Sequence, residues 1–385
     1  MKKQNKIYLL IGFVVLILIG LVLVLFNKGN NEEEIKIGVI VPLTNSILSQ
    51  RGVDSSRALS LAVKEVNENG GINGKKISLV VEDNEGKNEE SVTILNKLLM
   101  KNDTDLFFSL FTGPTSTIYP LIKENSKFLM YQSTVFSMAE DNEALICADY
   151  WSFDKLGERF AELAYEEKSN KVGLLRSQTE YGQLFEDSFV KKADELGLNY
   201  MIQVFQLSDL DVNTQLTKFK YSGVDLIISD GFEQNYLNLF HGINDLNYAE
   251  DLTVVGSSTI YDVSKMDDPI FLSVLNSSKV ITAYHDINNS NLVLNDFISE
   301  WENEYGSYPT TEAIYSYDDI NVLASSLEAC DDLGQIKDTK CIYDQLTSKE
   351  VEILEGSTYI NEDCIFERGL VFLVYDNGEW KDYEK

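Results

Sequence analysis

The clearest pattern of apolar and polar positions lies between residues 35 and 83, where it predicts a strand, a helix and a second strand. Residues 35–43 form a nearly continuous apolar run, which is typical of a buried strand. Apolar residues then recur at helical spacing at Ala58, Leu59, Ala62, Val63 and Val66. Gly70, Gly71 and Gly74 supply positive-φ positions that end the helix, and apolar residues alternate again over residues 77–81. This order predicts a parallel strand pair with a right-handed crossover.

Strand and helix patterns alternate through most of the remaining chain. Further apolar runs of strand length lie at residues 106–111, 128–131, 171–175, 201–205, 224–228 and 252–255. Helix-length segments separate these runs from one another. A chain of 385 residues also exceeds one ordinary hydrophobic core. We therefore expect two doubly wound α/β lobes.

The N-terminus carries an apolar segment of a different kind. Residues 7–26 contain no charge and, at about 20 residues, match the length that spans a bilayer as a helix. Lys2, Lys3 and Lys6 precede this segment, and the positive charge on that side predicts a cytoplasmic N-terminus. We expect residues 1–34 to form a cytoplasmic tip, a single-pass transmembrane anchor in the cell membrane and a short tether, with the rest of the chain outside. A long, cleaved signal peptide is the alternative.

The charge of the chain limits the partners that it can bind. The sequence contains 62 acidic and 32 basic residues, a net charge of -30. This excess of negative charge repels nucleic acids and anionic lipid surfaces, so we expect neither as a partner. The two histidines, His241 and His285, are not spaced as zinc ligands, and the sequence has no Gly-x-Ser-x-Gly motif. We therefore expect no cofactor, no metal and no enzymatic activity.

The four cysteines can be oxidised outside the cell. Cys330 and Cys341 bracket a turn-rich segment between two expected helices, and we predict a local disulfide between them. Cys147 and Cys364 are left over and lie far apart in the sequence.

Several short motifs carry a family resemblance. They are Pro42-Leu43-Thr44, the turn Gly70-Gly71-Ile72-Asn73-Gly74, Asp83 at the end of the second strand, Tyr305-Gly306 with Pro309, and the helix start from Ala313 to Asp318. From about residue 35 onward the chain resembles the branched-chain amino-acid-binding (Leu/Ile/Val-binding-like) family of type I periplasmic solute-binding proteins of ABC importers. The resemblance implies two Rossmann-like lobes joined by a three-strand hinge. Residues 35–147 plus 282–363 would form the first lobe, and residues 148–281 plus 364–385 the second.

The resemblance also places the two remaining cysteines. Cys147 falls at the first crossing between the lobes and Cys364 at the third, where the crossing strands run close together. A hinge disulfide follows from this placement. The alternative is a pair of buried thiols.

In open α/β sheets, ligands bind beyond the carboxyl ends of the strands, so the loops after the strands hold the candidate site. Residues 111–116 enter a helix directly after a strand, and the hydroxyl groups and free N–H groups there suit a carboxylate. By resemblance to the family's Gly/Ser-rich loop, Thr112 is the best single candidate. An ordinary helix cap is the alternative. By resemblance, Ser133 and Thr134 hold the amino and carboxylate groups of a ligand. The two are considered together because the local alignment slips by one residue.

The second lobe contributes aromatic residues and one departure from the family. By resemblance, Tyr181 and Phe232 close over the side chain of a small ligand. Ser258 stands where amino-acid binders carry the acid that pairs with the α-ammonium group. This departure weakens the assignment of an amino acid, because a buried ammonium group needs a counter-charge. The nearby acids that can replace it are Glu180, Asp230 and Asp262.

Arg51 follows the first strand, at a position where many relatives have an aromatic residue that covers the ligand. Its guanidinium group can pair with a carboxylate of the ligand. The alternative is a solvated arginine at the rim of the site.

Together, these features predict a membrane-anchored, extracytoplasmic solute-binding protein of an ABC import system. We expect a monomer that captures a small solute, either an amino acid or a related polar or carboxylate compound, by closure of the hinge between the lobes. Its partner would be an ABC permease in the same membrane. A ligand-sensing ectodomain that acts through a partner receptor is the alternative, and an enzyme is the least favoured class.

Overall fold

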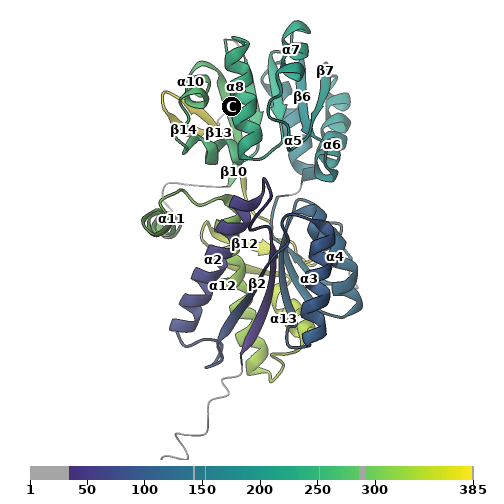
Figure 1. Cartoon of the computed structure of the whole chain (residues 1–385), viewed down its shortest axis with the longest axis vertical. Coiled ribbons are helices and arrows are strands. Elements are labelled where there is room, and N and C mark those ends of the chain that lie inside the picture. Colours follow the sequence, from purple (N-terminus) through teal and green to yellow (C-terminus); the bar gives the residue numbers. More distant parts are fainter. Residues whose placement is uncertain (1–33, 142–143, 152, 251, 286–291, 384–385) are drawn as a thin grey trace, which may run out of the picture.

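The computed structural model describes residues 34–383, except 142–143, 152, 251 and 286–291. Two lobes lie one above the other, and each is built on its own β-sheet (Figure 1). The transmembrane anchor that we predicted at residues 7–26 lies outside the described residues. Within the described part of the chain, no helix combines the length and the apolar character needed to cross a membrane.

The first lobe contains a parallel sheet with the strand order β2-β1-β3-β4-β5. Its strands are β1 (Ile35–Val41), β2 (Ile77–Asp83), β3 (Leu106–Leu110), β4 (Phe128–Gln132) and β5 (Leu145–Ala148). One face is covered by α2 (Ser49–Glu68), α12 (Thr311–Asp332) and α13 (Thr339–Leu346), and the other by α3 (Asn88–Lys101) and α4 (Thr112–Glu124). The same lobe carries α11 (Leu292–Tyr305) and the hairpin of β11 (Lys349–Ile353) and β12 (Gly356–Ile360).

The second lobe contains a mixed sheet with the strand order β14-β13-β10-β9-β8-β6-β7. The parallel strands are β6 (Val172–Ser177), β7 (Tyr200–Phe205), β8 (Leu226–Ser229), β9 (Thr253–Gly256) and β10 (Lys279–His285). The antiparallel strands are β13 (Leu370–Asp376) and β14 (Glu379–Asp382). One face is covered by α5 (Phe153–Glu166) and α6 (Glu180–Leu196), and the other by α7 (Asn213–Tyr221), α8 (Glu233–Asp245), α9 (Thr259–Ser264) and α10 (Pro269–Ser277). The expected pair of α/β lobes is therefore confirmed.

The strand, helix and strand predicted at the start of the chain are also confirmed. Strand β1 pairs in parallel with β2, with Ile35 opposite Ile77. Helix α2 ends at Glu68, and the φ angle of Gly71 in the turn that follows is +64°. A Cβ atom on Gly71 would lie 2.2 Å from the carbonyl oxygen of Lys75, so this turn requires glycine. The turn thus allows the chain to reverse closely and bury the apolar face of α2 on the sheet.

The chain changes sheets after β5, after β10 and again before β13. Strand β10 extends to His285 in the second sheet. The lobe bounds that we placed at residues 147, 282 and 363 stay a prediction.

Both cysteine pairs form disulfides. Cys330 of α12 is joined to Cys341 of α13, as predicted. Cys147 of β5 is joined to Cys364, so the structure contains the hinge disulfide and not the alternative pair of thiols. The backbone N–H of Ala148 also donates to the carbonyl oxygen of Cys364 at 2.9 Å. The first and third passages between the lobes are therefore bonded directly to each other.

Candidate functional site

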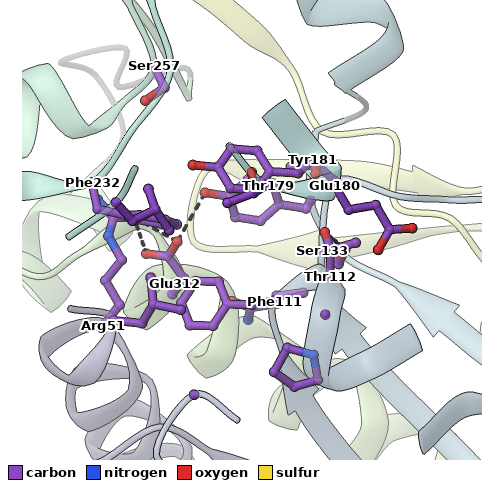
Figure 2. Close-up of a pocket in the computed structure, with 18 of the residues that line it drawn as sticks. Arg51, Phe111, Thr112, Ser133, Thr179, Glu180, Tyr181, Phe232, Ser257 and Glu312 are labelled. Carbon is purple, nitrogen blue, oxygen red and sulfur yellow. Dashed lines mark hydrogen bonds and ion pairs between the residues drawn. The ribbon is translucent and has the colours of Figure 1, made fainter. Parts of the chain in front are cut away.

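A cavity of about 310 Å³ lies between the two lobes, beyond the carboxyl ends of the parallel strands (Figure 2). The first lobe contributes the residues after β3 and β4, and the second lobe contributes the residues after β6, β8 and β9. Its aromatic lining consists of Phe111, Tyr150, Trp151, Tyr181 and Phe232. Its charged lining consists of Arg51, Glu180 and Glu312. The dimensions and the mixture of apolar and polar groups suit a small organic molecule.

Six of the seven predicted ligand-binding residues line this cavity. They are Arg51, Thr112, Ser133, Thr134, Tyr181 and Phe232. Ser258 does not, because it is the buried residue that precedes α9, whereas its neighbour Ser257 faces the cavity. The local sequence Gly256-Ser257-Ser258 offered two adjacent hydroxyl groups, and only the backbone geometry distinguishes them.

Two buried hydroxyl groups form the polar part of the first-lobe wall. The Oγ1 atom of Thr112 and the Oγ atom of Ser133 lie 2.9 Å apart, and each residue is less than one tenth exposed. Thr112 is the first residue of α4, and the first N–H groups of a helix have no acceptor within the helix. Hydroxyl groups beside such N–H groups form a site that favours negative charge. This corner of the cavity can therefore hold a carboxylate.

Phe111 joins β3 to α4 with an unusual backbone conformation. Its φ and ψ angles are 68° and 149°, a region that L-residues rarely adopt. Its ring meets the ring of Phe232 edge-on, with centroids 5.8 Å apart, and Phe232 in turn meets Tyr181 at 6.0 Å. Aromatic side chains from both lobes thus touch across the cavity. No sequence pattern indicated this role, because the apolar run over residues 106–111 marks Phe111 only as the end of a strand.

Arg51 is a buried arginine and not the solvated one that was the alternative. It is 1% exposed, and each of its guanidinium nitrogens contacts an oxygen of the protein. The Nη1 atom donates to the Glu312 carboxylate at 2.6 and 2.7 Å, and the Nε atom lies 2.8 Å from Glu233. The Nη2 atom donates to Thr259 at 2.9 Å and lies 3.4 Å from Asp262. The alternative of a solvated rim arginine is therefore wrong. Contact of Arg51 with a ligand stays a prediction, because Arg51 lines the cavity.

The carboxylates around Arg51 decide its charge. Burial alone would lower the pKa of Arg51, but Glu233, Glu312 and Asp262 more than offset burial, so the pKa is raised well above its ordinary value. Burial also raises the pKa of Asp262, although Arg51 opposes this shift. Arg51 is therefore permanently charged. Its partners Glu312 and Glu233 are 261 and 182 positions away along the chain by residue number, so no local sequence pattern could identify them.

The acids proposed to replace the missing ammonium partner have three different environments. Asp262 faces Arg51. Asp230 accepts hydrogen bonds from the backbone N and the Oγ of Ser177, both at 2.7 Å, and burial raises its pKa to about 6. Glu180 is exposed, and among the three it alone lines the cavity. No group of three or more acids, histidines or cysteines in the described part of the chain is arranged to hold a metal ion.

Two further polar atoms belong to residues that line the cavity. The Nε1 atom of Trp151 and the Oε1 atom of Gln132 are buried and, within the described residues, have no hydrogen-bond partner. The Nε2 atom of Gln132 is held by Asp319 at 2.8 Å and by Ser316 at 3.1 Å. Buried polar atoms normally have partners. Trp151 and Gln132 thus carry a donor and an acceptor for which the described residues supply no partner.

The sequence of the chain is similar to those of known proteins. A sequence model described as "periplasmic binding protein" matches residues 34–379. The chain is 27% identical over 215 residues to a Leu/Ile/Val-binding protein homolog 2 of Brucella abortus, which covers 53% of the chain and 55% of that relative. It is 20% identical over 338 residues to homolog 7 of Brucella suis, which covers 81% of each. The chain thus spans about half the length of the first of these relatives.

Solved structures show the same fold at low sequence identity. A leucine-binding protein of Thermotoga maritima has a TM-score of 0.77 and 19% identity, covering 91% of this chain and 98% of the other. A solute-binding protein of Rhodopseudomonas palustris in complex with 3,4-dihydroxybenzoic acid has a TM-score of 0.80 and 16% identity, covering 91% and 97%. A branched-chain amino-acid transporter protein of Streptococcus pneumoniae, in complex with isoleucine, has a TM-score of 0.75 and 19% identity, covering 91% and 98%.

Proposed function

Because the chain belongs to the periplasmic binding protein family, we propose that it is an extracytoplasmic solute-binding protein of an ABC import system. The observation that carries this proposal is the cavity between the lobes, to which both lobes contribute polar and aromatic side chains. A molecule held there is covered from both sides, so closing and opening of the lobes would govern capture and release. The closed form would then be the form that a permease recognises.

The geometry favours a small solute with a carboxylate and an apolar body. The carboxylate would bind at the hydroxyl groups of Thr112 and Ser133, beside the start of α4. The apolar body would lie against Tyr181 and Phe232. Two similar proteins hold such molecules in their crystals, isoleucine in one and 3,4-dihydroxybenzoic acid in the other. If the solute is an amino acid, Glu180, which lines the cavity, would pair with its ammonium group.

A screen of the full-length protein tests this proposal. The unfolding temperature is measured with branched-chain and aromatic amino acids, with hydroxybenzoates and with neutral amides, because a solute that binds the folded state raises it. Thr112→Val removes a hydroxyl group at nearly constant shape. A hydrogen bond to a charged group contributes about 1.5–3 kcal/mol, so this variant should weaken binding of a carboxylate roughly 10- to 100-fold.

Thr117→Val is the matched control, because Thr117 lies on the same helix, bonds to the carbonyl oxygen of Gly113 and is absent from the cavity lining. The Thr117→Val variant should bind the solute with the affinity of the wild type. Absence of any shift across the whole screen, or equal affinities of the two variants, would count against the proposed binding mode.

The N-terminal segment completes the proposal. Residues 7–26 would hold the binding lobes at the outer face of the cell membrane as a monomer beside the permease. Carbonate extraction of membranes tests this placement. The full-length chain should remain in the pellet, and a chain that starts at residue 34 should be released. Recovery of both chains in the soluble fraction would refute the anchor and leave the binding proposal intact.

A further inference from the structure

Arg51 is bonded to both lobes at the same time. It lies on α2 of the first lobe and contacts Glu312 on α12 of that lobe. It also contacts Glu233 on α8 and Asp262 on α9, which belong to the second lobe. Separation of the lobes would therefore break some of these contacts and leave others unchanged.

Arg51, Glu233, Asp262 and Glu312 form a buried ion-pair cluster, and its contacts are strong only while the two lobes are close together. The side chain of Arg51 is 2% exposed, and those of Glu312 and Asp262 are 3% and 6% exposed. Charges away from water attract each other more strongly than charges at a surface. When the lobes separate, water can reach Glu233 and Asp262, and the loss of the ion pairs is partly offset by hydration. The cluster thus favours the closed arrangement by a finite amount.

The ion-pair cluster also contacts the aromatic residues that line the cavity. The guanidinium group lies 5.6 Å from the centroid of the Phe232 ring, and Phe232 contacts Phe111 and Tyr181. On the other side, the hydroxyl group of Tyr150 donates to Glu312 at 3.1 Å. Figure 2 shows Arg51, Glu312 and Phe232 beside one another at one end of the cavity. Contacts of Arg51 with the second lobe therefore hold Phe232 over the cavity.

We propose that Arg51 is a positioning residue that latches the two lobes closed. It acts through Glu233 and Asp262 of the second lobe while Glu312 holds it on the first, and it makes no bond to the solute. The latch populates the closed arrangement before a solute arrives, so the solute selects a closed form that already exists. This inference deepens the proposed function, because closure is the step by which capture would occur.

The distance between the lobes of the full-length protein tests the latch. Spin labels are attached to cysteines introduced at Glu89 and Leu210, which are exposed positions on opposite lobes. Both positions lie close to the cavity, because Asn88 and Leu207 line it. Bound solute is first removed by urea and refolding with the disulfides intact. The wild type should show a population with a short distance between the labels, and Arg51→Met should lose most of it. The dissociation rate of any solute identified in the screen should rise at least about tenfold in the same variant.

Arg57→Met is the matched control. Arg57 lies on α2 as well, but it is 40% exposed at the side chain and pairs with Asp54 of its own lobe at 3.2 Å. It should keep the distances of the wild type. Glu233→Gln removes one contact from the opposite lobe and should lose part of the short-distance population, which keeps the test decisive if Arg51→Met does not fold.

Two results would overturn the latch: a wild type without the short-distance population, or Arg51 and Glu233 variants whose distances match the Arg57 control. Either result leaves the proposed function standing, because solute binding is measured separately in the screen. Conversely, a wild type that closes but binds no solute would refute the proposed function and leave the latch in place.

Discussion

Two buried arginines, Arg51 at the cavity and Arg368 at the hinge, are surrounded by similar groups but join different parts of the molecule. Arg368 contacts both oxygens of Asp149 at 2.6 Å. It also contacts Glu355 at 2.8 Å and Asp318 at 3.0 Å. Each arginine thus has three carboxylates around it. Those around Arg368 belong to the first lobe and the passages between the lobes, whereas those around Arg51 come from both lobes.

The difference shows how one kind of interaction can serve as a permanent joint or as a separable one. Arg368, before β13, binds Asp149, after β5, next to the disulfide between Cys147 and Cys364. A rotation of the lobes about these passages leaves the contacts of Arg368 in place. The same rotation pulls Glu233 and Asp262 away from Arg51. We therefore expect changes at the hinge to alter stability, and changes at Arg51 to alter closure.

The largest expected effect follows from removal of the covalent part of the hinge. Cys147 and Cys364 are separated by 217 positions, and Cys330 and Cys341 by 11. In the chain-entropy model, loss of the longer loop costs about 5 kcal/mol and loss of the shorter loop about 3 kcal/mol of unfolding free energy. Serine substitution of each pair, followed by urea denaturation, measures this difference. Equal losses would show that the hinge disulfide constrains the unfolded chain no more than the local one does.

The next effect compares the two arginines directly. Arg368→Met leaves three buried carboxylates without their counter-charge and should cost about 3–5 kcal/mol of unfolding free energy. Arg51→Met should cost less than half of that, because opening of the lobes allows water to reach Glu233 and Asp262. Urea denaturation of both variants measures the difference. Lys97→Met, which removes an exposed ion pair with Glu82, should change the unfolding free energy by less than about 1 kcal/mol.

If Arg51→Met lowered the unfolding free energy as much as Arg368→Met, Glu233 and Asp262 would remain buried in the variant. The contrast between a separable and a permanent joint would then be lost. Equal destabilisation by Lys97→Met would instead indicate that loss of any positive charge is harmful in this acidic protein.

The contrast between the arginines also marks the limit of what the sequence could predict. Apolar patterns located β1 to β4, β6 to β9 and helix α2, because burial of one face depends on residues near each other in the chain. The rule that ligands bind at the carboxyl ends of strands indicated the loops that line the cavity, and the family resemblance selected Thr112 and Ser133 within them. The partners of Arg51 and Arg368 were not found, since Glu312 is 261 and Asp149 is 219 positions away. Pairings of this kind arise only from the folded topology.

Two further misses have local causes. Ser258 was chosen over Ser257 by resemblance, and a shift of one residue at the start of α9 buries it. The positive φ angle of Phe111 could not be predicted from the sequence, because residues with a positive φ angle are usually glycine or asparagine. Both residues lie at junctions between a strand and a helix, where apolar periodicity carries no information.

The carboxylates of the hinge predict a pH dependence of intermediate size. Burial raises the pKa of Glu355 to about 7 and that of Asp318 to about 6, although Arg368 opposes both shifts. Their pKa values are higher in the folded than in the unfolded protein, so the folded state binds more protons between pH 4 and 7. The stability from these groups is fully present below about pH 4 and is lost as the pH rises through 6 and 7. The unfolding temperature should therefore be higher at pH 5.5 than at pH 8.

Glu355→Gln and Asp318→Asn remove the titrating groups while they keep the shape of the side chains. Each variant should flatten the change of unfolding temperature between pH 5.5 and 8. An unchanged pH profile in the double variant would place the titration elsewhere in this acidic chain. The hinge would then contain carboxylates that are ionised throughout this range.

The smallest expected effect concerns an aromatic contact that, like the contacts of Arg51, joins the two lobes. Phe111 and Phe232 meet across the lobes with ring centroids 5.8 Å apart and an interplanar angle of 87°. Phe189 and Tyr200 meet within the second lobe in nearly the same geometry, at 5.8 Å and 86°. An aromatic pair of this kind contributes about 0.5–1.5 kcal/mol beyond its buried area. Phe111→Leu should therefore weaken solute binding by roughly two- to tenfold, as measured by titration calorimetry.

Phe189→Leu is the matched change inside one lobe. It should lower the unfolding free energy by about 1 kcal/mol and leave the solute affinity unchanged, because Phe189 and Tyr200 move together when the lobes open. Phe111→Leu should instead lower the solute affinity and leave the unfolding free energy nearly unchanged. A loss of affinity in both variants would mean that solute binding depends on the rigidity of the second lobe. A loss confined to Phe111→Leu would extend the contrast between Arg51 and Arg368 from ion pairs to aromatic contacts.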